Sequence, residues 1–285
     1  MKFEEYSILL SGPCKLCNGK RYIEKDNQQE ICKCQLRALI HYRHDQLPVD
    51  LRYKEWGDYT GDNVKKSKEI KVRNWEKCRC LAFAYCFSKE SISEINDCNI
   101  SLGSIQQILK KRISKSKIIK RKKEGANIAF FGDDDTGKTL LAALVAKEII
   151  YASVLLGDLD FKWLPFSTLI NALNFDRPNY SLIDEVSCVD FLVLDNVYVP
   201  QQGNYMKNFL DELFHDRRTK RLPIILTGTH AVADSNAKTK TRGDLLLDSR
   251  QAVGDEFYRL LNSENTQKIN LQKEKIVTDD VEGDG

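Results

Sequence analysis

Apolar and polar positions follow two different patterns, and the change between them falls near residue 126. The C-terminal half alternates short, continuous apolar runs with longer segments of helical periodicity. A continuous apolar run is typical of a parallel strand, because helices cover both faces of such a sheet. We therefore predict an α/β fold with a parallel sheet flanked by helices. The predicted strands are 127–131, 161–164, 191–194, 223–226 and 268–271, and the predicted helices are 138–151, 167–173, 204–217 and 245–261.

The N-terminal half shows weaker periodicity and no repeat at a fixed period. A helical pattern covers 35–45, and Pro48 ends it because proline cannot continue a helix. Residues 49–110 place aromatic side chains between charged ones, which predicts a small, mainly helical region. The stretch 104–117 has the apolar marks of an amphipathic helix.

Composition narrows the class of protein. The chain has 285 residues, with 42% hydrophobic and 30% charged residues, as globular proteins do. We found no apolar run of roughly 18 residues, so no membrane-spanning segment is expected. The first residues carry acids and lack a basic n-region and a cleavage site, so we expect no signal peptide and a cytoplasmic location. Nine cysteines without a secretion signal argue against a disulfide scaffold.

A phosphate-binding loop follows the first predicted strand. The eight residues from Gly132 to Thr139 fit the pattern G-x-x-x-x-G-K-[ST] without a mismatch. Its glycines let backbone N–H groups surround a phosphate, Lys138 brings a cation to the β and γ phosphates, and Thr139 offers a hydroxyl to magnesium. The three acids in the loop must point away from the phosphates. The candidate ATP-binding residues are Gly132, Asp133, Asp134, Asp135, Thr136, Gly137, Lys138, Thr139 and Leu140.

A second element of the same site is predicted at the end of the strand 191–194. Four apolar residues there lead into Asp195, which is the form of a Walker B element. A carboxylate at the C-terminal end of a strand beside the P-loop would hold magnesium, directly or through water. The alternative is a buried strand that ends in a turn aspartate. Thr227-Gly228-Thr229 follows the next strand, and a polar residue there would reach the γ phosphate or the attacking water.

From Asn127 onward the chain resembles the AAA+ ATPases of the DnaC-type helicase loader and IstB-type transposition helper group. The segments that carry the resemblance are NIAFFGDDDTGKTLLAALVAKEI, FKWLPFSTLINAL, VDFLVLDNV and LPIILTGT. The resemblance implies a homo-oligomer with nucleotide sites between subunits. It also implies a replicative ring helicase as partner, or a transposase in the second case, and single-stranded DNA as a further ligand.

The chain departs from that group at the residues that act on water. Asn196 follows Asp195 where the group usually has an acid that polarises the attacking water. The group's sensor position corresponds to Thr229. Arg250 and Arg259 lie in the region of the arginine that reaches a neighbour's γ phosphate. We take Lys138, Asp195, Asn196, Thr229, Arg250 and Arg259 as candidate catalytic residues.

Four cysteines near the N-terminus have the spacing of a zinc site. Cys14-x-x-Cys17 and Cys32-x-Cys34 are separated by 14 residues. Four thiolates at this spacing can close a tetrahedral zinc site, and so small a module would depend on the metal for its fold. The alternative is four ordinary reduced cysteines, and His41 or His44 can replace one thiolate. A second, less regular set consists of Cys78, Cys80, Cys86 and Cys98.

Charge is distributed unevenly although the net charge is only +3. Nine Lys or Arg and no acid lie between 110 and 123, and this run either neutralises DNA phosphates or forms a solvated helix and linker. We predict a zinc- and partner-binding region at 1–109, a basic linker at 110–126, an AAA+ ATPase core at 127–275 and an acidic tail at 276–285. Three functions remain open: a loader of a replicative helicase, an IstB-like helper of a transposase, and an ATP-switched adaptor that hydrolyses slowly.

Overall fold

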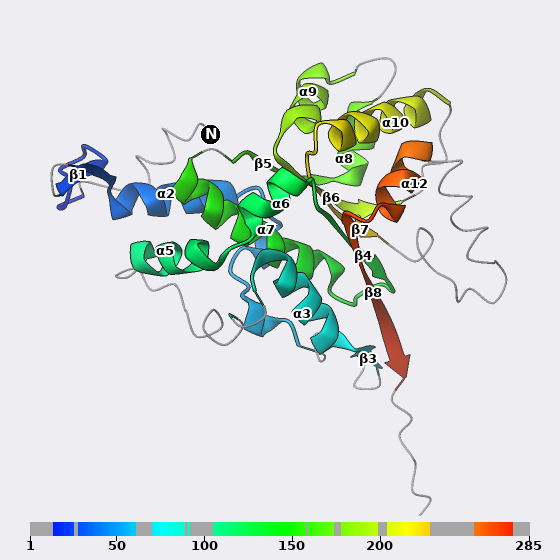
Figure 1. Cartoon of the computed structure of the whole chain (residues 1–285), viewed down its shortest axis with the longest axis horizontal. Helices are drawn as coiled ribbons and strands as arrows, with labels where there is room; N and C mark the ends of the chain where they lie inside the picture. The colour runs from blue at the N-terminus through cyan, green and yellow to red at the C-terminus, as the bar shows by residue number, and fades with distance from the viewer. Residues whose placement is uncertain are drawn as a thin grey trace, which may run out of the picture.

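A six-stranded sheet forms the centre of the molecule (Figure 1). The computed structural model describes residues 14–25, 28–60, 70–88, 91, 105–157, 159–173, 178–198, 204–228 and 254–275. Five strands run parallel in the order β8-β4-β7-β6-β5, and β3 joins antiparallel at the edge of β8. The strands are β3 Ile70–Arg73, β4 Asn127–Gly132, β5 Phe161–Pro165, β6 Phe191–Val197, β7 Ile224–Gly228 and β8 Thr266–Lys275.

Helices cover both faces of this sheet, which confirms the predicted α/β class. Successive side chains of a strand point to opposite faces. In β4, Ile128 and Phe130 therefore pack into one apolar core while Ala129 and Phe131 pack into the other. The first face carries α2 Lys33–His44, α3 Trp75–Cys86, α5 Ile105–Lys115, α6 Ile118–Glu124 and α7 Lys138–Leu156. The second face carries α8 Phe166–Ala172, α9 Tyr180–Cys188, α10 Asn204–Thr219 and α12 Asp255–Asn262.

Helix α7 is the central helix of the first face. Its 19 residues are apolar enough, by length and composition, to cross a membrane, and among the described residues no other helix meets that test. Most of its apolar window, 78%, is buried inside the protein. The apolar character of α7 is therefore explained by its packing between the sheet and the N-terminal helices.

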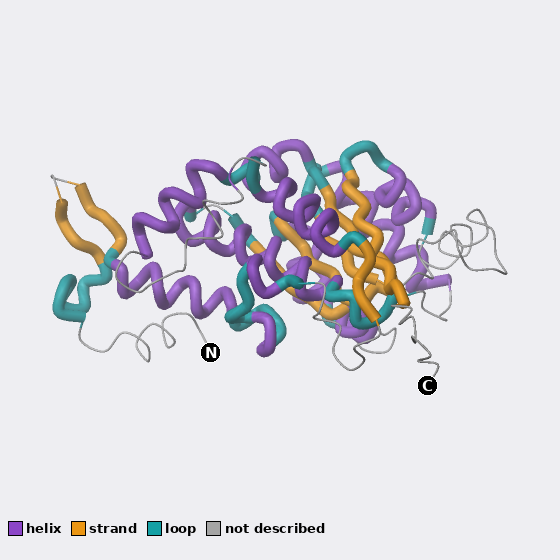
Figure 2. Tube along the Cα trace, turned by 90° about the horizontal axis from the view of Figure 1, so that it is seen from below, coloured by secondary structure: helices purple, strands orange, loops and turns teal. Residues whose placement is uncertain are grey.

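The N-terminal elements pack onto α7 and do not form a core of their own within the described residues. Side chains from α2, α3, α5 and α6 belong to the same apolar cluster as α7 and the sheet. Two short 3-10 helices, η1 Val49–Leu51 and η2 Trp56–Asp58, connect α2 to this layer. The hairpin of β1 Tyr22–Lys25 and β2 Gln28–Ile31 lies at the far end of α2, away from the six-stranded sheet (Figure 2).

The segment 110–126, predicted as a basic linker, is helical and packed in the structure. It comprises the second half of α5 and all of α6. Arg112 is 2% exposed and pairs with Glu148 of α7 at 2.8 Å, and its guanidinium lies 5.3 Å from the centre of the Tyr151 ring. Burial raises the pKa of Glu148 above its ordinary value, although Arg112 lies beside it and opposes the shift.

Candidate functional site

The loop between β4 and α7 has the backbone shape of a phosphate-binding loop. Gly132 has φ 145°, and a Cβ at this position would lie 1.8 Å from the carbonyl oxygen of Leu271 in β8. Only glycine tolerates so close an approach. The next residue is fixed as well, because the Asp133 N–H donates to the same carbonyl at 3.0 Å. The neighbouring strand β8 therefore holds the start of the loop in place.

Lys138 lies across this loop at the beginning of α7. Its Nζ donates to the carbonyl oxygens of Gly132 and Asp133, at 2.9 and 2.5 Å. Asp134 and Asp135 are exposed to solvent, and Asp133 is partly buried. Helix α7 is 19 residues long, so its N-terminus adds the positive end of a long helix dipole to the lysine.

The side chains of Thr139 and Asp195 meet at the C-terminal ends of the strands. The Thr139 hydroxyl donates to Asp195 Oδ1 at 3.0 Å, although 56 residues separate the two. The hydroxyl of Thr227, in β7, donates to the same oxygen at 2.6 Å. A carboxylate flanked by two hydroxyls is the type of oxygen-rich donor set that magnesium prefers. These residues therefore fit the magnesium role predicted for Thr139 and Asp195.

Thr227 is a member of the site whose position the sequence indicated only in part. The predicted sensor was Thr229, which lies outside the described residues, as does Arg250. Thr227, two residues earlier, contacts Asp195 directly and also accepts the Asn196 N–H at 2.7 Å. The sequence feature that indicated this position was the polar segment after the strand 223–226. It predicted a threonine at the site but did not distinguish Thr227 from Thr229.

Asn196 follows Asp195 in a left-handed conformation, with φ 60°. Asn is among the few non-glycine residues that accept this region readily. Its side chain is exposed beside the carboxylate, at the end of β6 where the ladder to β7 is irregular. Local backbone geometry therefore favours asparagine at this position independently of any role in handling water.

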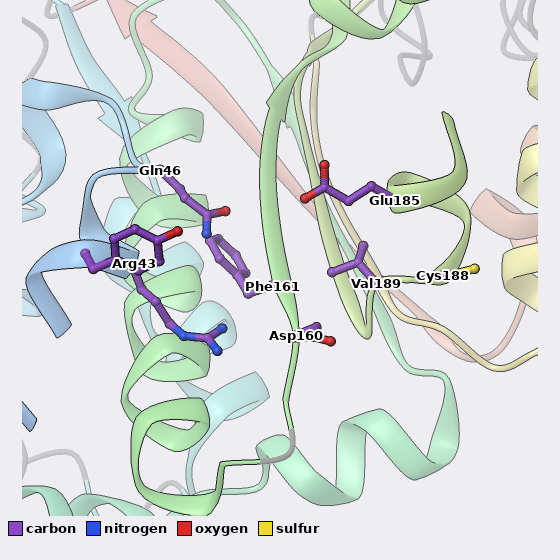
Figure 3. A pocket seen from close by; sticks show the side chains of 8 residues that line it. Arg43, Gln46, Asp160, Phe161, Glu185, Cys188 and Val189 are labelled. Atoms are coloured by element: carbon purple, nitrogen blue, oxygen red, sulfur yellow. The ribbon is translucent and has the colours of Figure 1, made fainter. Parts of the chain in front are cut away.

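Two other acids, Asp184 and Glu185, would replace the acid missing at position 196 if they reached the phosphate site from a loop, but they lie elsewhere. Asp184 and Glu185 belong to α9, which precedes β6 and so lies near the opposite ends of the strands. Glu185 accepts a hydrogen bond from Lys162 at 2.8 Å and lines a cavity of about 400 Å³ together with Arg43 and Asp160 (Figure 3). This cavity is formed by α2, α9 and the start of β5. The hypothesis that Glu185 reaches the phosphate site from a loop is therefore wrong.

Arg259 is exposed on α12, with 62% of its side chain accessible. Its guanidinium donates to Glu256 at 2.6 Å, and Arg218 binds the same carboxyl group at 2.8 Å. Partial burial of Glu256 acts to raise its pKa, but the hydrogen bonds from the two arginines hold this pKa below its ordinary range. Arg259 therefore lies on the surface of the protein.

The four N-terminal cysteines come together as the spacing predicted. Their sulfur atoms all lie within 4.8 Å of one another, with Cys14 to Cys32 at 3.8 Å and Cys17 to Cys34 at 3.6 Å. Four thiolates around zinc at about 2.3 Å give sulfur–sulfur distances of about 3.8 Å. Asn18, Gly19 and Arg21 have positive φ and shape the turn after the first pair. The donor set and its dimensions therefore fit zinc.

The thiols of this cluster differ in their surroundings. The pKa of Cys14 is lowered to about 7, chiefly because the backbone N–H of Cys17 hydrogen-bonds to its sulfur. Burial raises the pKa of Cys32 and of Cys34. A metal ion would deprotonate all four groups and offset the cost of holding them together.

Other candidate ligands do not join a metal cluster in the described part of the chain. His44 is buried against the Tyr151 ring, and burial lowers its pKa to about 3. Cys78 and Cys86 are eight residues apart on α3, about 12 Å along a helix, which is too far for one metal ion. Cys98 lies outside the described residues. Cys78 and Cys86 of the second cysteine set therefore do not bind one metal ion together.

A parallel sheet, a P-loop before α7 and an aspartate at the end of β6 together form the arrangement that is typical of P-loop NTPases. Over 144 residues the chain is 25% identical to the replicative helicase loader DnaC of Escherichia coli strain K12, and the DnaC of Shigella flexneri gives the same figures. This confirms the resemblance to DnaC-type AAA+ proteins. The alignment covers 48% of this chain and 54% of the relative, so the chain spans about half the length of the curated relatives it matches.

Two of the solved structures that match the chain do so with TM-scores below 0.5. The crystal structure of the DnaC helicase loader has a TM-score of 0.46 and 14% identity, and covers 75% of this chain and 98% of that one. A putative primosome component from Streptococcus pyogenes has a TM-score of 0.45 and 18% identity, over 84% and 98% of the two chains. No family model matches the chain.

Proposed function

We propose that this protein binds ATP with magnesium and uses it to load a replicative ring helicase onto single-stranded DNA. The observation that carries the proposal is the 144-residue similarity to the replicative helicase loader DnaC. In this role Lys138 binds the β and γ phosphates, and Thr139 and Asp195 hold magnesium. An arginine from a neighbouring subunit, Arg250 or Arg259, completes the site in a homo-oligomer.

A pull-down experiment with the tagged protein identifies the proposed partner. The tagged protein is used to capture binding proteins in the presence of ATP, with Lys138→Ala as the control that binds nucleotide more weakly. Recovery of the replicative helicase by the wild type supports loading. Recovery of a transposase instead supports the IstB-like function. The neighbouring genes also distinguish the two functions: a helicase and a primase gene beside this gene favour loading, and a transposase gene favours the IstB-like function.

A slow ATP switch is the alternative that a specific observation favours. Asn196 cannot take a proton or supply negative charge to the attacking water, and Glu185 lies away from the site. Positioned general bases typically contribute about 10²–10⁴-fold to a rate. We therefore propose that the isolated protein hydrolyses ATP slowly and acts as an ATP-held clamp, unless a partner supplies the missing group.

Replacing Asn196 by an acid is expected to increase ATP turnover. Asn196→Asp tests this more cleanly than Asn196→Glu, because aspartate tolerates φ 60° better than glutamate does. Asn196→Glu reaches further but carries backbone strain. Turnover is measured as phosphate release, with and without single-stranded DNA. The exposed Asn208→Asp adds the same charge on α10 and should leave the rate unchanged. Brisk wild-type hydrolysis that neither Asn196→Ala nor the acidic variants alter would contradict the hypothesis.

Single-stranded DNA is proposed as a ligand of the basic surface, but the structure narrows the residues that can bind it. Arg121 donates to the carbonyl oxygen of Tyr85 at 3.1 Å and lies 5.1 Å from the centre of its ring. Lys122 pairs with Asp190 at 2.8 Å. Lys120 and Lys123 are exposed on α6, and Lys120 makes a surface pair with Glu124 at 3.6 Å. These two lysines are the better candidates for phosphate contact.

The double variant Lys120→Ala, Lys123→Ala is expected to weaken the salt dependence of DNA binding. Each lost phosphate contact reduces the slope of log K against log salt by about 0.7 for a single strand, so two contacts reduce it by about 1.4. Binding is measured by fluorescence anisotropy over a series of salt concentrations. Lys268→Ala, an exposed position on β8, is the control. An unchanged slope in the double variant would assign α6 a purely structural role.

A further inference from the structure

Tyr59 lies directly beneath the P-loop, although it comes from the N-terminal region. It caps η2, and its side chain is 1% exposed. Its hydroxyl donates to the carbonyl oxygen of Thr136 at 3.1 Å, across 77 residues of sequence. On its other side the ring meets Trp75 of α3, with ring centroids 6.4 Å apart. A buried hydroxyl that donates to a loop carbonyl fixes the orientation of that peptide group.

The orientation of this peptide group matters for phosphate binding. A trans peptide is planar, so its C=O and N–H point in opposite directions. Tyr59 holds the Thr136 carbonyl toward the protein core, and the N–H of Gly137 therefore points out of the core. P-loops receive phosphate oxygens on backbone N–H groups that point in this direction. The Tyr59 hydroxyl thus orients the Gly137 N–H, one of the hydrogen-bond donors that a phosphate site needs, before the phosphate binds.

The Tyr59 ring also explains the glycine at position 137. Gly137 has φ 82°, and a Cβ there would lie 2.6 Å from Cε2 of Tyr59. The ring therefore packs where a side chain would otherwise be. Asp135, two residues earlier, has φ 58°. A left-handed conformation strains a residue other than glycine, so the loop keeps its shape at Asp135 only when its surroundings support it.

The segment that carries Tyr59 is itself anchored to α7. Lys147 pairs with Glu55 at 2.9 Å, and the indole N–H of Trp56 donates to Glu148 at 3.0 Å. Lys147 and Glu148 are both buried. Because α7 begins at Lys138 in the P-loop, the same helix holds both the loop and the segment beneath it. The position of Tyr59 relative to the loop is therefore set at two points.

We propose that Tyr59 is a positioning residue of the nucleotide site, whose hydroxyl holds the Thr136–Gly137 peptide so that the Gly137 N–H faces the phosphates. The proposal rests on the proposed binding of ATP by this loop. It makes the N-terminal segment part of the nucleotide site, so that ATP affinity depends on a hydrogen bond from outside the predicted ATPase core.

Tyr59→Phe tests this role, because it keeps the ring and removes only the hydroxyl. ATP affinity is expected to fall about 2- to 13-fold, the equivalent of one neutral hydrogen bond. The matched control is Tyr85→Phe. Tyr85 is also buried, and its hydroxyl also donates to a backbone carbonyl, that of Ala126 at 2.6 Å, but before β4. Affinity is measured by titration with a fluorescent ATP analogue, and thermal stability is recorded for each variant.

Tyr85→Phe is expected to lose thermal stability like Tyr59→Phe while keeping wild-type affinity. Two results would overturn the positioning role and leave the ATP site intact. One is equal affinity of Tyr59→Phe and a wild type whose binding depends on Lys138. The other is an equal loss of affinity in both tyrosine variants, which would indicate general destabilisation. A wild type that binds no ATP would overturn the proposed function together with this inference.

Discussion

Lys138→Ala is expected to lower the affinity for ATP by about 10- to 150-fold while leaving the fold intact. This range corresponds to the loss of one charge-assisted hydrogen-bonded contact. In the structure the Lys138 ammonium donates to carbonyl oxygens of its own loop, those of Gly132 and Asp133. The substitution therefore removes the cation of the phosphate site together with these two hydrogen bonds.

The control for this experiment is a lysine of the same charge at the other end of the sheet. Lys220 is exposed after α10 and pairs with Asp216 at 3.2 Å. Lys220→Ala should bind a fluorescent ATP analogue like the wild type. Circular dichroism of both variants checks that the fold is retained. Equal binding by Lys138→Ala and the wild type would remove the basis for assigning this loop to nucleotide binding.

The parallel sheet and the phosphate site were predictable because both leave local patterns in the sequence. A strand buried on both faces is a continuous apolar run, as at 191–194, and a P-loop needs two glycines and a lysine at fixed spacing. The predicted strands begin within two residues of the observed ones, whereas β6 and β8 extend three and four residues further at their C-terminal ends. Strand β3 was not predicted, because its four residues, in which Ile70 and Val72 alternate with Lys71 and Arg73, give too short a pattern.

Contacts between distant segments left no such pattern. Tyr59 is one of several aromatic residues in 49–110, and nothing local marks it as the one that reaches Thr136. The basic run was predicted from composition as a linker or a DNA-binding segment. Arg112 within it instead pairs with an acid in the middle of an apolar helix. Composition counts charges, but it cannot show which of them find a buried partner in the fold.

The purified protein is expected to contain about one zinc ion per chain. Its ligands are the four cysteines beside the hairpin of β1 and β2, and these residues together form the hairpin module. Structural zinc contributes about 10–16 kcal/mol of binding free energy in small modules, and the module has little apolar core to replace it. Cys14 and Cys34 are only partly buried, and the module lies at the end of α2. Removing the metal should therefore unfold the hairpin while the six-stranded sheet remains folded.

Cys34→Ser tests this expectation against Cys188→Ser, which changes an exposed cysteine on α9. Elemental analysis of protein prepared without chelators should find zinc in the wild type and in Cys188→Ser, and little in Cys34→Ser. Limited proteolysis should then cut the variant between 14 and 34 and spare the remainder. Because Cys34 is the second residue of α2, the loss of zinc also frees the N-terminus of the helix that packs onto α7. Wild-type protein without zinc that resists proteolysis in this segment would show that the four thiols fold the module without a metal.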